Sequence, residues 1–478
     1  MKKKVSKQDI IWNYLGIIMS MASNFLLLPF MMYFLDSDYL GLWYVYLSIG
    51  GIVTLFDFGF NPTLARNVAY CWSGAISLNT EGVNYVEKSE PNFTLLNKVM
   101  KTCKRIYLII SLAALFILAT AGFFYIQHIS KDIFGSVVIV SWAIYALAVF
   151  LNLYYGYFAT FLRGVGAIAQ YNKINIGARV IQIVVSVVLM YFGFGIIAVA
   201  VAYLLYGFLL RAFSKRAFYR YENLGKHLSE IDVTPDASEI KELFGVVWHN
   251  AWRDGVVAIA NYCANQASTL VASFFLTLTE TGIYSIGVQL ITAIATIAAG
   301  LYTAYQPSMQ RAHINNDKNE SRKLMSTAMV SFDLIFIIGL IALLTVGIPI
   351  LRIIKPTTIF SRSVIVGIAV YNFFYKRQSY YTSYISNTNY VPYMKAYLVS
   401  GFTGVICAIA LISIFDMGVW GLIIGQLIPQ LIYNCWKWPN EVYKILDTSL
   451  GSMSKMGLNE IKNILQSYLR RFKRRQIK

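Results

Sequence analysis

Charged residues lie inside long apolar stretches of this chain, where water cannot solvate them. They are Asp57, Arg179, Arg253, Asp254, Asp333, Lys376 and Arg377. A charged side chain at the centre of a bilayer costs at least about 2.5–3.5 kcal/mol when it faces lipid. We therefore expect these residues to pair with one another or to face a polar space. Cations so placed can bind an anionic group, and acids can bind a cation or take up a proton.

The elements that must position these residues are about twelve apolar stretches. The chain is 57% hydrophobic and only 13% charged. About 20 apolar residues cross a bilayer as a helix, so the sequence predicts an all-α polytopic membrane protein. We expect spans near 10–35, 39–62, 106–126, 133–159, 174–192, 194–212, 246–275, 281–306, 325–350, 359–386, 393–415 and 417–437.

Lys and Arg residues alternate between the two sides of these spans. About 33 of the 41 fall in the N-terminus, in alternate loops and in the tail, whereas about three, Lys131, Arg352 and Lys355, fall in the other loops. Cytoplasmic loops carry the excess of positive charge, so we expect both termini to be cytoplasmic. The same rule explains the net charge of +18. We therefore expect these basic residues to contact anionic lipids, and we expect no nucleic-acid partner.

Several classes of chemistry have no support in the sequence. The five cysteines form no CxxC pair and the four histidines show no metal-ligand spacing. There is no Walker A motif, so we expect no direct ATP hydrolysis. A soluble catalytic domain and an Asp-rich metal motif are also missing. We therefore expect a protein that is not an enzyme and that carries no cofactor or metal, with a proton or sodium ion as a coupling ion.

The tail, residues 438–478, has a character of its own. Apolar residues recur at helical spacing from Leu458 to Phe472, and basic residues follow up to Arg475. This pattern indicates an amphipathic helix on an anionic membrane surface, with a frayed basic tail as the alternative.

An internal repeat divides the chain into two halves. The segment Phe60-Asn61-Pro62-Thr63-Leu64-Ala65-Arg66 resembles Tyr305-Gln306-Pro307-Ser308-Met309-Gln310-Arg311, and each follows a hairpin with an acid and a glycine in its outer turn. We expect the two prolines to end helices, and Arg66 and Arg311 to lie at the cytoplasmic entrance, as headgroup anchors or for first capture of substrate.

An even number of spans separates the two copies, so both have the same orientation in the membrane. This predicts two pseudo-symmetric six-helix lobes, 1–212 and 246–437, around a central cavity, joined by a cytoplasmic linker, 213–245.

The first 70 residues carry a family resemblance. The runs are Asn13-Tyr14-Leu15-Gly16, Asn24-Phe25-Leu26-Leu27-Leu28-Pro29-Phe30, Leu40-Gly41-Leu42-Trp43 and Asp57-Phe58-Gly59-Phe60. With the two six-helix lobes, they resemble the multidrug, oligosaccharidyl-lipid and polysaccharide exporter superfamily, and within it the bacterial O-antigen and capsule repeat-unit flippases. The resemblance implies translocation of undecaprenyl-diphosphate-linked oligosaccharide from the cytoplasmic to the periplasmic leaflet of the bacterial inner membrane. An O-antigen polymerase and a chain-length regulator would be its partners.

A substrate with a diphosphate and sugars implies particular roles for the intramembrane residues. The planar guanidinium fork binds phosphate oxygens bidentately, so we expect Arg253 and Arg377 to bind the diphosphate and Lys376 to add charge. Arg179 is expected to snorkel to the interface instead.

Acids and tyrosines complete the candidate site. Asp57, Asp254 and Asp333 would either hold these cations or bind the coupling ion. Tyr371 and Tyr375 lie deep in a tyrosine-rich span, and sugar contact and packing are both open for them.

Two other functions remain as alternatives. One is a membrane-embedded polysaccharide polymerase or glycosyltransferase, which the short outer loops disfavour. The other is a cation-coupled drug antiporter of the same fold, which the cationic character of the spans disfavours.

Overall fold

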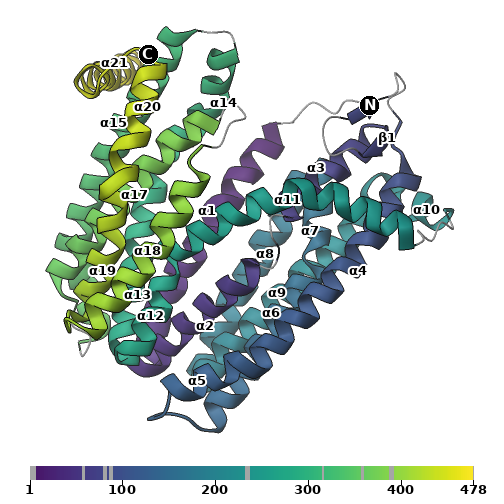
Figure 1. Cartoon of the computed structure of the whole chain (residues 1–478), viewed down its shortest axis with the longest axis horizontal. Coiled ribbons are helices and arrows are strands. Elements are labelled where there is room, and N and C mark those ends of the chain that lie inside the picture. The colour runs from purple at the N-terminus through teal and green to yellow at the C-terminus, as the bar shows by residue number, and fades with distance from the viewer. Residues whose placement is uncertain are drawn as a thin grey trace. The chain divides into compact units, whose positions relative to one another are not determined.

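The computed structural model shows an almost entirely helical chain (Figure 1). It describes residues 7–55, 57, 60–78, 83–85, 90–231, 237–314, 317–356, 360–386 and 392–476. The chain divides into two compact units, Met1–Tyr262 and Cys263–Lys478.

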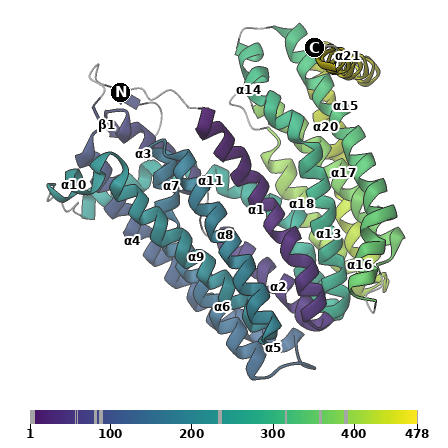
Figure 2. The ribbon, with the colours of Figure 1, turned by 180° about the vertical axis from the view of Figure 1, so that it is seen from behind.

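The first unit is a helical bundle with one small hairpin of strands. Its elements are α1 (Lys7–Phe34), α2 (Ser37–Leu55), α3 (Phe60–Trp72), β1 (Ala75–Leu78), β2 (Val83–Tyr85), α4 (Phe93–Ile117), the π-helix η1 (Leu118–Gly122), α5 (Phe123–Ile129), α6 (Ser136–Tyr155), α7 (Tyr157–Gly164), α8 (Ile168–Tyr191), α9 (Gly195–Arg220), the 3₁₀ turn η2 (Tyr221–Asn223), α10 (Leu224–Ser229) and α11 (Ala237–Asn265). The two strands pair antiparallel. Helices α6, α8 and α9 lie side by side (Figure 2).

The second unit contains helices and no strand among its described residues. Its elements are α12 (Ala267–Phe275), α13 (Leu278–Ala298), α14 (Gly300–Ile314), α15 (Lys318–Ala342), the π-helix η3 (Leu343–Gly347), α16 (Ile348–Ile354), α17 (Arg362–Ile385), α18 (Met394–Ser413), α19 (Gly418–Pro429), the π-helix η5 (Gln430–Asn434), α20 (Cys435–Ile445) and α21 (Leu450–Gln476).

Helices occupy the positions of all the expected spans. Seven described helices are long and apolar enough by themselves to cross a membrane. Many of their large apolar side chains are exposed, for example Ile109, Phe116 and Ile338. In a bilayer such side chains face lipid, because lipid tails solvate them as a core would. The chain is therefore a polytopic membrane protein, as the sequence predicts.

The second expected span, 39–62, is interrupted. Helix α2 ends at Leu55 and α3 begins at Phe60, so Asp57 lies in a break between helices and not within a span. The expectation that Pro62 and Pro307 end helices is wrong, because Pro62 lies in the first turn of α3 and Pro307 lies inside α14. A proline is tolerated in a first turn, where its missing N–H has no helical acceptor to bond.

The third span of each half supports the internal repeat. Both have the same segment lengths: 25 α-helical residues, 5 π-helical residues and 7 α-helical residues, in α4–η1–α5 and in α15–η3–α16. Both also begin in the same way. Asn92 accepts from the Leu95 amide at 3.0 Å, and Asp317 accepts from the Glu320 amide at 3.0 Å. Each side chain satisfies an amide that has no partner within its helix.

The turn before the last span of each half repeats as well. Gly193 and Gly195 have φ of +84° and +51° before and at the start of α9, while Asp416 and Gly418 have φ of +49° and +52° at the start of α19. These left-handed positions favour glycine and tolerate aspartate. A similar turn with two left-handed residues therefore joins spans five and six, and spans eleven and twelve.

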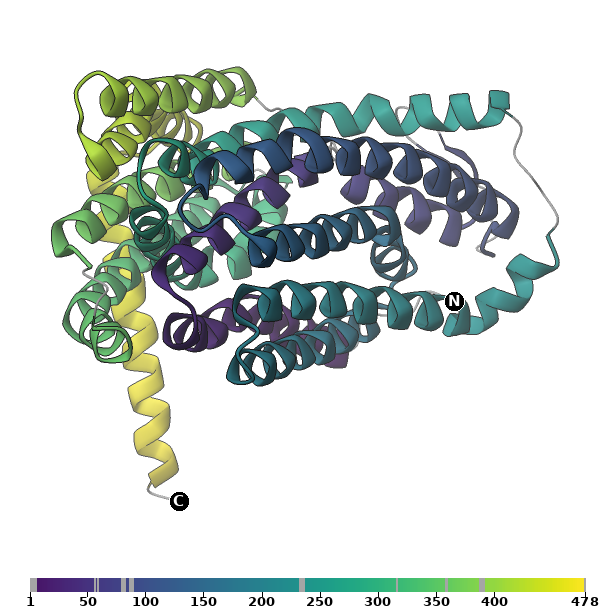
Figure 3. The same cartoon turned by 90° about the horizontal axis from the view of Figure 1, so that it is seen from below.

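The regions expected as linker and tail are largely helical. Residues 213–245 include the end of α9, all of α10 and the start of α11, and the division between the compact units falls later, inside α11. The tail includes the end of α20 and all of α21, and the C-terminal part of α21 extends beyond the other helices of its unit (Figure 3). Just before it, Lys318 donates to Asp447 at 2.6 Å, and this hydrogen bond holds the pKa of that exposed carboxyl below its usual value.

Candidate functional site

Arg377, on α17, lies in an ion pair with Asp333 on α15. Its Nε donates to Asp333 Oδ1 at 3.1 Å, and the two side chains are 21% and 27% exposed. The guanidinium also lies 5.8 Å from the ring centre of Tyr381, whose hydroxyl is 3.1 Å from that of Tyr443 on α20. Only Nε is used by the acid, so the two Nη groups keep donors for another oxyanion.

Lys376 is the next residue on α17 and points in a different direction, since successive helical residues are about 100° apart. Its Nζ lies 5.7 Å from the ring centre of Tyr375. No acidic partner for Lys376 occurs among the described residues. The second unit thus holds one paired and one unpaired cation side by side.

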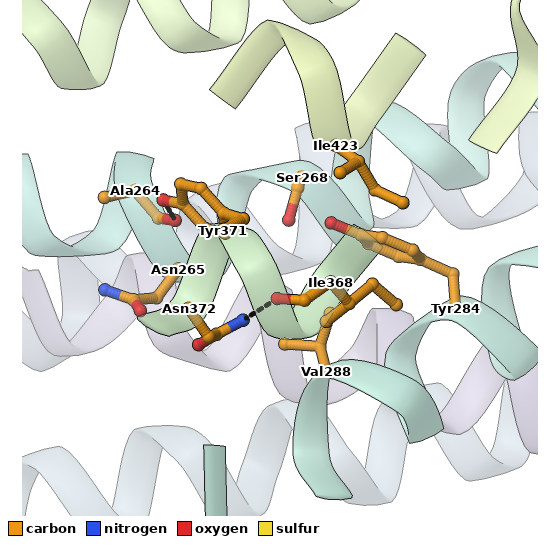
Figure 4. A pocket seen from close by; sticks show the side chains of 9 residues that line it. All are labelled: Ala264, Asn265, Ser268, Tyr284, Val288, Ile368, Tyr371, Asn372 and Ile423. Atoms are coloured by element: carbon orange, nitrogen blue, oxygen red, sulfur yellow. Dashed lines mark hydrogen bonds between the residues drawn. The ribbon is translucent and has the colours of Figure 1, made fainter. Parts of the chain in front are cut away.

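Tyr371 and Tyr375 are buried and stack on each other, with ring centres 5.9 Å apart. The Tyr371 hydroxyl donates to the Ala264 carbonyl at 2.5 Å. Figure 4 shows Tyr371 on the wall of a small pocket, across which Ser268 and Tyr284 point toward each other. The pocket has a volume of about 10 Å³, which is room for one water molecule. A sugar would fit only if the pocket widened.

A polar network, absent from the sequence predictions, connects α17, α18 and η5. Gln378 donates to Gln430 at 2.7 Å, Gln430 donates to Ser400 at 3.2 Å, and Asn434 donates to both Ser400 and Gln430. Trp438 closes the network by donating to Asn434 Oδ1 at 2.8 Å. These side chains are almost fully buried, so the network holds helices together where no water competes. A hydropathy plot shows each of these Gln and Asn residues as isolated, so the sequence does not indicate that they bond to one another.

Asp57 is enclosed by the first unit. Its carboxylate accepts from the Tyr107 hydroxyl on α4 at 2.5 Å and from the backbone amide of Asn61 at 3.2 Å. No cation pairs with it among the described residues. A carboxylate held by hydrogen bonds at a helix break can take up a proton without first breaking an ion pair.

Arg179 and Arg211 form a second group of cations in the first unit. Arg179, on α8, donates to Gln182 at 3.1 Å and lies 4.0 Å from the ring centre of Tyr206 on α9. The snorkelling expected of Arg179 stays a prediction. Arg211 was not expected as a site residue, because the apolar stretch ends beside it. Its helix continues to Arg220, however, so Arg211 lies inside α9.

Four of the candidate residues belong to helices whose side chains are only partly described. Arg66 lies on α3, Arg253 and Asp254 on α11, and Arg311 on α14. Their side chains lie outside the described part of the structure, so their expected roles stay predictions.

The comparisons with known proteins give a fold. No protein-family model and no curated protein sequence matches the chain. Among solved structures, an inward-facing multidrug resistance MATE family transporter of the MOP superfamily matches with a TM-score of 0.63 and 13% identity, over 93% of this chain and 100% of that one.

Two further structures match over most of their length. A MOP superfamily transporter from Pyrococcus furiosus Vc1 gives a TM-score of 0.51 at 16% identity, over 92% of this chain and 96% of that one. A point mutant of a MATE protein gives 0.50 at 16% identity, over 91% and 95%. At these identities the likeness concerns architecture. The chain therefore is a multi-pass membrane protein with the fold of the MATE transporters of the MOP superfamily.

Proposed function

We propose that this protein translocates a polyprenyl-diphosphate-linked oligosaccharide across the bacterial inner membrane by alternating access, as a step in O-antigen or capsule assembly. The lipid tail of such a substrate stays in the bilayer, whereas its diphosphate and sugars need polar partners along the way. A fold that serves transport in its structural relatives supplies two helical units for this task.

The observation that carries the proposal is that the unpaired charge on the described helices is positive. Asp333 is paired with Arg377, and Asp57 is held by hydrogen bonds, while Lys376 has no acidic partner among the described residues. Cations outnumber acids among the described residues of the expected spans. Unpaired positive charge in a low-dielectric setting favours an anionic ligand over a cationic one.

The second candidate is a cation-coupled drug antiporter. It is favoured by the solved structures, one of which is a multidrug resistance transporter. The fold does not decide between the two, since the Pyrococcus furiosus protein is described as having a binding pocket of reverse polarity that suggests a different function. The charges of this chain's own residues favour the anionic substrate.

Cells that lack the protein test the proposal. We expect single undecaprenyl-diphosphate-linked repeat units to accumulate on the cytoplasmic leaflet, with relief when the gene is restored. Unchanged glycan together with new sensitivity to cationic dyes would overturn the proposal in favour of the antiporter. Accumulation on the periplasmic side would place the block after translocation and favour a polymerase.

Variants of α17 connect the result to the site. Lys376→Ala and Arg377→Ala are expected to lower export at least tenfold at equal protein levels, because each removes a cation near the path. Arg362→Ala is the matched control, since Arg362 is an exposed cation at the other end of the same helix. Full export by both test variants would contradict a role for this pair in substrate binding.

A further inference from the structure

Two partly exposed arginines of the first unit carry buried hydrogen-bond donors that no described residue satisfies. The Nη1 and Nη2 atoms of Arg211 and the Nε atom of Arg179 are buried without a hydrogen-bond partner. Buried guanidinium donors are normally all bonded, because leaving one unmade forfeits the solvation it had in water. Arg179 lies over the ring of Tyr206, and Arg211 Nη2 lies beside Gly207, the next residue of α9, so both guanidiniums lie against the same turn of α9. The ring centre of Tyr203 is 6.4 Å from that of Tyr206.

The surroundings of these two guanidiniums are polar and closely packed. Tyr206 donates to Asn175 at 3.0 Å, and Arg179 lies over its ring. A Cβ added to Gly207 would overlap Asn152 Oδ1 and lie 3.1 Å from Arg211 Nη2, so only glycine leaves room there for both side chains. Helices α6, α8 and α9 thus supply amides, phenols and two cations to one place.

The two arginines lie at similar depths along their helices. Arg179 lies about 18 Å along α8 from Tyr191, and Arg211 lies about 24 Å along α9 from Gly195, at 1.5 Å a residue. Both helix ends flank the same turn, and a hydrocarbon core is about 30 Å thick. The two guanidiniums are therefore offset by about 6 Å along the helices and both lie within the span.

The corresponding place in the second unit is filled. Asn434 follows Gly418 by as many residues as Arg211 follows Gly195, after a similar left-handed turn. The side chain of Asn434 donates to Ser400 and Gln430, which closes the network there. The repeat therefore carries a satisfied amide in one half and an unsatisfied guanidinium in the other, and the difference indicates a ligand for the first half.

We infer that Arg179 and Arg211, with Tyr203, Tyr206 and Asn152 around them, bind a phosphate oxyanion. Guanidinium forks match phosphate oxygens in geometry and charge, and two forks offset along neighbouring helices suit two linked phosphates. The identification of this oxyanion as the substrate's diphosphate rests on the proposed function. The site itself lies in the first unit and needs none of the residues on α17.

Binding to the purified full-length protein tests the inference, with undecaprenyl diphosphate without sugars as the first probe and phosphatidylglycerol as the second. Arg179→Gln and Arg211→Gln should each weaken binding of undecaprenyl diphosphate about ten- to a hundredfold, the effect of losing a hydrogen bond to a charged group. Arg211→Lys should fall between. Arg216→Gln is the matched control, because Arg216 is an exposed arginine on the same helix.

The thermal midpoint of the ligand-free protein separates binding from folding. Arg211→Gln should leave the midpoint equal or higher, because it removes a partly buried charge whose Nη donors lack partners. A lower midpoint together with unchanged binding of both probes would show a structural role and overturn the inference.

The two probes also separate this inference from the proposed function. Arginine-dependent binding of phosphatidylglycerol alone would support the phosphate site and contradict the diphosphate substrate. Tight binding of undecaprenyl diphosphate that neither arginine variant weakens would overturn this site and leave the proposed function standing.

Discussion

Asp57 is an acid inside the first unit that no cation pairs with among the described residues. Two donors, the Tyr107 hydroxyl and the Asn61 amide, hold its carboxylate beside the break between α2 and α3. The amides at the start of α3 have no acceptor within the helix, and the one of Asn61 donates to the Asp57 carboxylate instead. The arrangement joins α4 to the break through one side chain.

Tyr107→Phe should therefore destabilise the first unit. The change removes a hydrogen bond to an acid and should cost about 1.5–3 kcal/mol of unfolding free energy. Thermal unfolding of the protein in detergent measures it, with Tyr191→Phe as control because Tyr191 is 75% exposed. Equal midpoints for the two variants would mean that the hydroxyl does not hold Asp57.

The ion pair of Arg377 and Asp333 makes a different prediction at the same scale. Arg377→Met alone leaves Asp333 without its cation, whereas Arg377→Met with Asp333→Leu leaves no charge behind. Because both side chains are about a quarter exposed, we expect the single variant to lose about 1–3 kcal/mol and the double variant to recover most of it. A double-mutant cycle on unfolding measures the coupling. Additive losses would contradict a paired arginine.

At the scale of elements, helix α21 is attached to α15 by a close crossing. A Cβ on Gly457 would overlap the Ser326 carbonyl oxygen and lie 2.6 Å from Val330 Cγ2, so the helices approach nearer than any side chain permits. Lys323 and Glu460 form an ion pair at 3.4 Å beside this crossing. The amphipathic tail is thus anchored to the start of the ninth span.

Gly457→Ala should loosen that anchor. The added methyl group meets backbone on the facing helix and should cost about 1–3 kcal/mol, seen as earlier proteolysis of the tail and a lower unfolding midpoint. Gly451→Ala is the control on the same helix, since nothing lies within 4 Å of its Cβ. If both alanine variants behave alike, the crossing does not depend on the glycine.

The sequence predicted where the helices lie better than how they are interrupted. Hydropathy located the spans because long apolar runs have one stable form in a bilayer. The break at Asp57 and the π-helical segments escaped prediction, because they lie within otherwise apolar runs. Arg211 was missed because hydropathy marks the end of the apolar run and not the end of the helix. Asp333 was one of three candidate acids, and only packing of α15 on α17 shows that Arg377 is its partner.

At the scale of the whole molecule, the distribution of Lys and Arg predicts the topology. With both termini cytoplasmic, cysteines placed at Lys131 and Lys355 should react with an impermeant reagent on intact spheroplasts. Cysteines at Lys226 and Lys455 should react only after the membrane is opened. The five native cysteines are free and would first be replaced. Labelling of residue 226 on intact spheroplasts would refute the orientation.

The two halves share an architecture and differ in chemistry. Third spans of equal segment lengths and similar left-handed turns before the last spans show a repeated fold. The charged residues do not repeat. The second half pairs Arg377 with Asp333, whereas in the first half the Nη donors of Arg211 have no hydrogen-bond partner among the described residues. We expect the repeat to supply the transport movement and these differences to supply recognition.

Transport by the purified protein in liposomes tests the central claim most directly. Undecaprenyl-diphosphate-linked glycan would be placed in one leaflet and its arrival in the other followed by a glycan-cleaving enzyme outside the vesicle. We predict protein-dependent translocation that Lys376→Ala and Arg377→Ala abolish and Arg362→Ala preserves. Vesicles that move a cationic drug against a proton or sodium gradient, and leave the lipid-linked glycan in its original leaflet, would contradict the account.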